Sequence, residues 1–310
     1  MAILVTGGCG HIGSHLIRRL YEEGREPVSY DLVPAPGSLD DLKDKVKFIR
    51  GSILNATELL DTVKKEKIER IVHTVSLLTA DSQASPVSAY NINIGGTVNV
   101  LEAAKIMNVK RVVYISSIAA YGAASVEPIS EEYPLIPVTI YGATKVACEH
   151  FGLNYANDYG LEFIALRLAY VWGAGRQRGV GKLATIVENP ARGLAAKVSG
   201  GSQKYEPIYI KDVVKALNLA CYVPETKHRI FNISSGEMIT LQEVADMVKT
   251  YIPDAKVKIE PGYDLGVPTQ GCLDLSKAKE ELRYEPDFKK EEALRDYMAD
   301  LRGLRSDIIQ

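Results

Sequence analysis

Short apolar runs alternate along this chain with longer segments whose apolar residues recur every three or four positions. The short runs are rich in Val and Ile and are typical of buried strands, whereas the longer segments are typical of amphipathic helices. Strands are predicted at residues 3–6, 28–31, 46–50, 68–73, 111–116 and 163–168. Residues 87–107 are predicted to form one long helix. This alternation predicts an α/β fold, with a doubly wound parallel sheet of Rossmann type covered on both faces.

The pattern changes beyond Leu168. Residues 173–181 are rich in Gly and Arg, and a short helix is expected to end near residues 189–190. Residues 240–243, with the sequence TLQE, form a capping box that predicts the start of another helix. We therefore expect a smaller, mixed C-terminal lobe, with residues 208–232 returning partly to the sheet.

A glycine-rich turn follows the first predicted strand. Residues 8–13, GCGHIG, satisfy the pattern G-x-G-x-x-G between a strand and a helix. Glycine lets the chain turn tightly, lets a pyrophosphate approach the backbone and lets the helix pack closely on the strand. The N-terminus of the helix adds free N–H groups and a positive dipole end. An ordinary strand–helix turn is the alternative, but the flanking elements favour a dinucleotide site.

Asp31 ends the second predicted strand. A carboxylate at this place can bind the ribose hydroxyls of an adenosine and would repel a 2′-phosphate. Residues 32–34 offer no Arg or Lys to receive such a phosphate. NAD is therefore favoured over NADP as the cofactor. The structural alternative is that Asp31 only closes the turn at residues 34–37.

Tyr141 and Lys145 lie one helical turn apart in the segment YGATK. A free tyrosine has a pKa near ~10, so it is a poor base at neutral pH. The ammonium of Lys145 at position i+4 is expected to lower the pKa of Tyr141. Ser117 ends the strand predicted at 111–116, where ligands of parallel sheets bind, and its hydroxyl is expected to orient a substrate oxygen. The alternatives are a solvated helix face and a serine that merely begins a loop.

Composition limits the remaining function classes. The chain has 310 residues, 46% hydrophobic and 25% charged, with a net charge of −2, as in an ordinary soluble globule without a basic field for nucleic acid. No segment approaches the length of a membrane span, and the first strand leaves no room for a signal peptide. Four cysteines without C-x-x-C spacing favour reduced thiols and a cytoplasmic location. His11 and His15 lack a third ligand nearby, so no metal is expected.

Five segments follow the order of motifs in the extended short-chain dehydrogenase/reductases, the family that contains sugar-nucleotide epimerases and dehydratases. They are TGGCGHIG at 6–13, VH at 72–73, NIGGTVNVLEAA at 93–104, SSIAAYG at 116–122 and YGATK at 141–145. The chain therefore resembles this family over nearly its whole length.

The resemblance implies hydride transfer at a secondary alcohol or ketone of a sugar or sugar nucleotide. The implied catalytic residues are Ser117, Tyr141 and Lys145. The expected cofactor contacts are Gly7, Gly10, His11, Ile12, Gly13, Asp31, Ser52, Ile53, Val75, Asn93, Ser116, Tyr141 and Lys145. The expected substrate contacts are Ser117, Tyr170, Arg176 and Tyr205. Asn93 is expected to support the lysine, and His73 is expected to be packed or hydrogen-bonded near the cofactor.

The resemblance also implies a division of the chain. Residues 1–167 are expected to form the NAD-binding domain, with 208–232 returning to it, and residues 168–310 the discontinuous substrate-binding lobe. In relatives the helix that holds the catalytic tyrosine and the long helix at 87–107 pack against their copies, so a homodimer is expected. The expected small-molecule partner is a sugar or a sugar-like substrate.

Three positions depart from the family pattern. Tyr170 replaces an asparagine near the substrate phosphates, and Tyr205 replaces an arginine that grips the diphosphate. Ser52 replaces an acid, which should weaken a contact to the adenine amine. Arg176 and Arg178 are expected to compensate for the lost arginine.

These departures leave three functions open. The first is an NAD-dependent epimerase or dehydrogenase of a sugar or sugar nucleotide. The second is a dehydrogenase or reductase of a small non-nucleotide polyol, hydroxy acid or ketone. The third is an NAD-sensing protein without turnover, which the presence of both Tyr141 and Lys145 disfavours.

Overall fold

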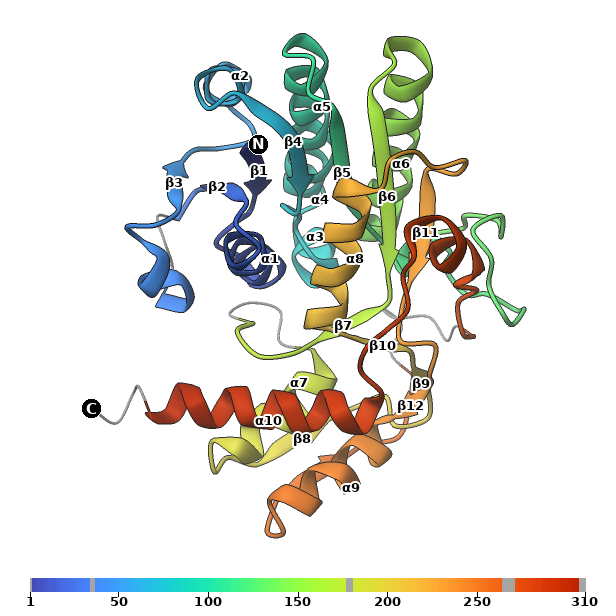
Figure 1. Ribbon diagram of the computed structural model, residues 1–310. Coiled ribbons are helices and arrows are strands. Elements are labelled where there is room, and N and C mark those ends of the chain that lie inside the picture. Colours follow the sequence, from blue (N-terminus) through green and yellow to red (C-terminus); the bar gives the residue numbers. More distant parts are fainter. Residues whose placement is uncertain (1, 34–36, 177–180, 264–270, 307–310) are drawn as a thin grey trace.

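The computed structural model describes residues 2–33, 37–176, 181–263 and 271–306. Within this part, seven parallel strands form one sheet in the order β11-β6-β5-β4-β1-β2-β3 (Figure 1). Their bounds are β1 Ala2–Thr6, β2 Glu26–Asp31, β3 Lys47–Arg50, β4 Ile68–His73, β5 Arg111–Ser117, β6 Glu162–Leu168 and β11 Ile230–Ile233. The chain order runs outward in both directions from β1 and β4, which end side by side at Thr6 and His73. Open parallel sheets bind ligands at such a switch point.

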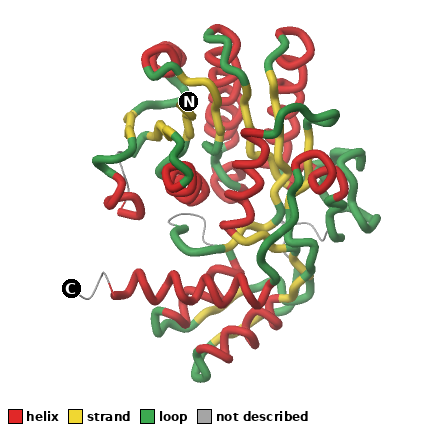
Figure 2. Tube along the Cα trace, viewed as in Figure 1, coloured by secondary structure: helices red, strands yellow, loops and turns green. Residues whose placement is uncertain are grey.

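Helices cover both faces of the sheet because its strands are apolar on both faces (Figure 2). Ile3 and Val5 of β1 point toward α1 (His11–Glu22) and α8 (Ile210–Tyr222). Leu4, between them, points to the opposite face, where it packs with residues of α2 (Ala56–Lys65), α5 (Gly96–Ile106) and α6 (Ile140–Tyr159). The alternation of side chains along one strand thus serves two hydrophobic cores.

The predicted fold class is confirmed. All six predicted strands are present, with ends that differ by at most two residues from the predicted ones. The predicted helix at 87–107 is a continuous run of α4 (Pro86–Ala89), the π-helical turn η2 (Tyr90–Gly95) and α5. The seventh strand, β11, pairs with β6 in parallel, so a segment after residue 208 does contribute to the sheet.

The C-terminal lobe lies beyond the carboxyl ends of the strands, at the bottom of Figure 1. Its strands are β7 Tyr170–Trp172, β8 Ala196–Val198, β9 Lys204–Tyr205, β10 Pro207–Tyr209, β12 Ile239–Thr240 and β13 Val257–Ile259. Its helices are α7 Lys182–Ala191, α9 Leu241–Tyr251 and α10 Lys290–Ser306. They enclose a third hydrophobic core around Trp172, Tyr205 and Tyr297. The exact division into two domains stays a prediction.

Short helical turns connect the larger elements. They are η1 Gly37–Leu42, α3 Thr79–Ala84, η3 Ile118–Ala120 and η4 Ala278–Leu282. The predicted capping box at the start of α9 is present, with Thr240 Oγ1 accepting the N–H of Glu243 at 3.1 Å and Glu243 Oε2 accepting the N–H of Thr240 at 2.7 Å. No helix in the described ranges combines the length and apolar character needed to cross a membrane.

Candidate active site

The turn after β1 is tight and depends on glycine. Gly7 has a φ of +71°, and a Cβ there would lie 2.7 Å from Thr74 Oγ1. A Cβ on Gly13 would lie 2.1 Å from the carbonyl oxygen of Gly7. Helix α1 follows with Gly10 as its N-cap, without a side-chain cap and without an acidic residue in its first turn. The first N–H groups of α1, those of His11 and Ile12 included, therefore suit a phosphate, and the loop fits a dinucleotide.

Asp31 lies at the edge of this loop. Its Oδ2 accepts the backbone N–H of Cys9 at 3.0 Å, and its Oδ1 accepts the backbone N–H of Val33 at 3.2 Å. A carboxylate at this place suits a ribose diol and opposes a 2′-phosphate. The bond to Val33 stays within the first residues after β2, and the bond to Cys9 ties β2 to the glycine loop, so a structural and a cofactor role of Asp31 are compatible. Residues 34–36 of the predicted turn lie outside the described residues.

Ser52 and Ile53 follow β3, and Val75 follows β4. Ser52 Oγ accepts the backbone N–H of Leu54 at 3.2 Å. Ile53 is buried against Gly96, where a Cβ would lie 2.3 Å from Ile53 Cδ1. Val75 packs against the glycine loop. The predicted contacts to the adenosine half of the cofactor thus lie along one edge of the sheet.

Ser117, Tyr141 and Lys145 meet at the carboxyl end of β5. The Ser117 hydroxyl lies close enough to the Tyr141 phenol to lower its pKa. Lys145 Nζ donates to the carbonyl oxygen of Ile115 at 2.7 Å and lies 5.4 Å from the centroid of the Tyr141 ring. The three side chains predicted to be catalytic are therefore together, beside the switch point of the sheet, while their roles stay a prediction.

The protonation of the Tyr141 phenol differs from the sequence prediction, in which Lys145 lowers its pKa. Burial raises the pKa of Tyr141 to about 12, although the hydrogen bond with Ser117 and the charge of Arg176 oppose the rise. Burial also lowers the pKa of Lys145 to about 8. The chain alone holds a protonated phenol because desolvation outweighs the effects of Ser117 and Arg176.

Asn93 lies in the π-helical turn η2, behind the catalytic group. Its Oδ1 accepts the N–H of Leu77 at 2.7 Å, and its Nδ2 donates to the carbonyl of Leu77 at 3.1 Å. Nδ2 also donates to Thr144 Oγ1 at 3.0 Å. Asn93 therefore holds the residue that precedes Lys145, so any support of the lysine runs through the helix backbone.

His73 and Ser116 are buried among polar partners. His73 Nδ1 lies 2.6 Å from Thr6 Oγ1 and its Nε2 lies 3.1 Å from Thr97 Oγ1. Burial lowers the pKa of His73 to about 3, so the ring is neutral and hydrogen-bonded, as predicted. Ser116 Oγ donates to Glu149 Oε1 at 2.5 Å. A contact of Ser116 with a cofactor would therefore be made by its backbone.

The loop after β7 contacts the start of α1. His11 Nε2 and His15 Nε2 both donate to the carbonyl oxygen of Ala174, each at 3.0 Å. Arg176 Nη1 donates to a carbonyl of β7 at 3.2 Å, and its charge acts on the predicted catalytic tyrosine. In the part of the chain that the structure describes, no group of three or more His, Cys, Asp or Glu residues is placed to hold a metal.

Tyr170 and Tyr205 pack edge to face, with ring centroids 5.6 Å apart. The Tyr170 hydroxyl oxygen accepts the N–H of Lys182 at 2.9 Å, at the start of α7. Tyr205 is buried in the core of the lobe. Both phenols thus help to build the C-terminal lobe, and their role in substrate binding stays a prediction. Arg178 lies outside the described residues.

The sequence analysis missed a buried ion pair between Glu149 of α6 and Arg167 of β6. Arg167 Nη2 lies 2.7 Å from Glu149 Oε2, and Arg167 Nε donates to Glu149 Oε1 at 2.9 Å. The Arg167 side chain is only 4% exposed and the Glu149 side chain only 2%. The available signal was an acid one helical turn after Lys145, but this spacing is also common on solvated helix faces.

Comparisons with known proteins point to one family. The model of the NAD dependent epimerase/dehydratase family matches residues 3–234. The chain is 33% identical to a UDP-glucose 4-epimerase of Lacticaseibacillus casei, over 93% of this chain and 92% of that protein. The solved UDP-glucose 4-epimerase of Thermotoga maritima with UDP-glucose has a TM-score of 0.89 at 29% identity, covering 98% of this chain and 100% of that one. The Thermus thermophilus UDP-glucose 4-epimerase with NAD has a TM-score of 0.88 at 27% identity, covering 98% of this chain and 99% of that one.

The family match spans the glycine loop, the group around Tyr141 and almost the whole parallel sheet. It confirms the predicted family, the predicted enzyme class and NAD as the cofactor. This chain is a member of the NAD dependent epimerase/dehydratase family.

Proposed function

We propose that this protein is an NAD-dependent epimerase that inverts C4 of a UDP-hexose, with UDP-glucose and UDP-galactose as its substrate pair. The observation that carries the proposal is the meeting of Ser117, Tyr141 and Lys145 at the carboxyl end of β5, close to the glycine loop. Support also comes from relatives named UDP-glucose 4-epimerase, whose alignment with this chain covers more than nine-tenths of both chains.

Bound NAD supplies a positively charged nicotinamide that accepts a hydride and returns it. Added positive charge near Tyr141 favours its phenolate and acts in the same direction as the charge of Arg176. The Tyr141 oxygen then takes the proton of the C4 hydroxyl as a general base, while Ser117 Oγ holds the reacting oxygen. When the 4-keto sugar presents its other face, Tyr141 returns the proton to the same oxygen. The chain therefore needs no second acid and no net redox partner.

Two further properties belong to the same proposal. Residues 1–167 with 208–232 would bind NAD, and the rest of 168–310 would bind the sugar nucleotide. A homodimer is supported by exposed apolar side chains on the helices expected to pair, among them Val87, Tyr90 and Phe151, which are 72%, 62% and 42% exposed. All four cysteines are free thiols, in agreement with a cytoplasmic location.

A second candidate function is a dehydrogenase of a small polyol, hydroxy acid or ketone. It is favoured by one observation, the phenols of Tyr170 and Tyr205 at positions where the family pattern has an amide and a guanidinium. Neither phenol matches the bidentate grip of an arginine on a diphosphate.

The test is to identify the nucleotide released from the purified protein and then to offer it UDP-glucose with NAD. Formation of UDP-galactose without accumulation of NADH supports the epimerase. Accumulation of NADH with free polyols, and no UDP-galactose, supports the second candidate instead. Bound NAD with no turnover of either substrate class would leave the NAD-sensing alternative.

A further inference from the structure

Three residues of helix α6 contact three residues at the end of β5. The helix side chains are spaced four apart, so they lie along one face, and the strand residues follow one another without a gap. The pairs are Ser117–Tyr141, Ile115–Lys145 and Ser116–Glu149. The proposed chemistry uses Ser117 and Tyr141 directly, and Lys145 belongs to the same predicted catalytic group. It gives no task to Glu149.

Glu149 is held more firmly than a helix-surface acid would be. Besides the hydroxyl of Ser116, it accepts two hydrogen bonds from the guanidinium of Arg167, at 2.9 and 2.7 Å. The pair is almost wholly buried, and burying two charges is costly unless both are fully bonded. A bidentate pair of this kind fixes direction as well as distance.

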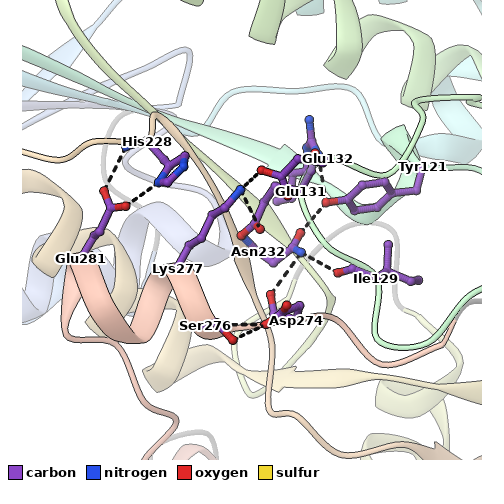
Figure 3. Close-up of polar contacts among 11 residues, drawn as sticks. Tyr121, Ile129, Glu131, Glu132, His228, Asn232, Asp274, Ser276, Lys277 and Glu281 are labelled. Atoms are coloured by element: carbon purple, nitrogen blue, oxygen red, sulfur yellow. Dashed lines mark hydrogen bonds and ion pairs between the residues drawn. The ribbon is translucent and has the colours of Figure 1, made fainter.

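The other end of Arg167 is anchored in the segment between β5 and α6 and at the sheet edge. Its Nη1 donates to the hydroxyl oxygen of Tyr121 at 2.9 Å and to the carbonyl of Glu131 at 3.0 Å. The Tyr121 hydroxyl donates to Asn232 Oδ1 at 2.7 Å, and Asn232 Nδ2 donates to the carbonyl of Ile129 at 2.9 Å (Figure 3). Glu149 is therefore fixed to β5, β6 and β11 at once.

The Glu149 carboxylate also acts on the charge of Lys145. The titratable groups that face the ammonium are Tyr114 of β5, His73 of β4, and Tyr141, Cys148 and Glu149 of α6. Burial raises the pKa of the Tyr114, Tyr141 and Cys148 groups and lowers that of His73, so these four are neutral at pH 7. Cys148 and then Glu149, the carboxylate paired with Arg167, oppose the lowering of the pKa of Lys145.

We propose that Glu149 is a positioning residue of the Ser117–Tyr141–Lys145 group, which aligns α6 on β5 and keeps Lys145 in its ammonium form. Its effect on turnover rests on the proposed function. Its effect on the lysine charge does not, because that charge can be measured without any reaction.

The first experiment measures the titration of Lys145 by ¹⁵N NMR in NAD-loaded protein labelled at lysine Nζ, with the signal assigned by Lys145→Arg. Glu149→Gln removes the charge and preserves the shape, and it should lower the pKa of Lys145 by about one unit, a tenfold change in proton affinity. Glu102→Gln is the control, since this α5 carboxylate bonds Lys105 and Tyr155 instead. An unchanged lysine pKa in folded Glu149→Gln would overturn the electrostatic part of the proposal.

Glu149→Gln leaves Arg167 buried without its ion pair, which destabilises the fold. A second variant therefore tests the same effect on Lys145 without this cost. The double variant Glu149→Gln with Arg167→Met carries no unpaired buried charge, and it should still lower the pKa of Lys145, by a smaller amount. A double variant that titrates like the wild type would contradict the proposal.

Ser116→Ala tests alignment alone, because it removes one hydrogen bond to Glu149 and no charge. We expect kcat to fall about tenfold with KM within twofold, since a displaced phenol loses reaction geometry and little substrate binding. An unchanged kcat would overturn the alignment part. If the wild type does not interconvert UDP-glucose and UDP-galactose, the proposed function fails, and the lysine titration still decides the role of Glu149.

Discussion

The parallel sheet and the C-terminal lobe use the same side chain, tyrosine, in different ways. At the carboxyl edge of the sheet, Tyr141 is half-buried and faces Ser117. In the lobe, Tyr205 is buried against Tyr170, whose hydroxyl oxygen accepts the first N–H of α7. The sheet thus presents a phenol at the predicted catalytic position, whereas the phenols of Tyr170 and Tyr205 pack against each other within the lobe. Residue type alone does not separate these roles, but position relative to a strand end does.

The largest expected effect is on the sheet side of this comparison. Tyr141→Phe removes the oxygen that we propose as general base, so we expect kcat to fall about 10³-fold, within the range of general acid–base catalysis. NAD affinity should stay within a few-fold. Tyr170→Phe is the matched variant in the lobe and should keep most of the activity. Steady-state kinetics and NAD binding measure both, and a Tyr141→Phe protein with near wild-type turnover would exclude this residue as the base.

In the lobe the larger effect should be on stability. Tyr205→Ala empties a buried aromatic site and should lower the free energy of unfolding by about 3 kcal/mol, measured by urea denaturation. Tyr205→Phe keeps the aromatic volume in the core and should therefore lose much less stability than Tyr205→Ala. Unchanged stability in Tyr205→Ala together with a raised KM would instead make Tyr205 a substrate residue.

A buried acid next to the lobe makes stability depend on pH. Burial raises the pKa of Glu206 to about 7, against hydrogen bonds from Ser234 and Leu273. The contribution of Glu206 to the free energy of unfolding is fully present below its unfolded pKa of about 4.5. This contribution is lost as the pH rises through 7. Between pH 5 and 8, the free energy of unfolding of Glu206→Gln should therefore fall by about 2 kcal/mol less than that of the wild type. Parallel pH profiles of the two proteins would contradict this.

The smallest expected effect concerns the cofactor edge. Asp31→Ala should weaken NAD binding about tenfold, the equivalent of about 1.4 kcal/mol, because it removes an acceptor for the ribose hydroxyls. NADP binding should weaken less or improve, since the repulsion of a 2′-phosphate is also removed. Calorimetric titration of both nucleotides compares the two losses. Equal losses would mean that Asp31 only shapes the glycine loop through Cys9.

The sequence predicted the sheet well because strand periodicity and glycine-rich turns are local signals. The loop at 6–13 needs glycine for contacts within a few residues, such as that of Gly13 with Gly7. Ser117, Tyr141 and Lys145 could be found for a related reason, since ends of parallel strands meet at one edge. Local spacing could not predict that desolvation raises the pKa of Tyr141, because burial is decided by the whole fold.

Burial and long-range polar contacts could not be predicted from the sequence either. Glu149 looks like any helix acid in the sequence, and its partner Arg167 lies 18 residues away on a strand. Tyr205, a predicted substrate contact, lies in the core of the lobe, and no sign of this burial is present in the sequence. The C-terminal lobe is built from strands of two or three residues, which carry too little periodicity to reveal which side chains point inward.

The most direct test of the central claim follows the hydrogen at C4 of the sugar. UDP-glucose carrying deuterium at C4 is incubated with the NAD-loaded protein, and the nucleotide sugars are analysed by mass spectrometry. Hydride removal and return within one site predicts UDP-galactose that retains the deuterium, and Tyr141→Phe should form almost none. UDP-galactose that has exchanged its C4 hydrogen with solvent, or wild-type protein that forms no UDP-galactose, would contradict the account.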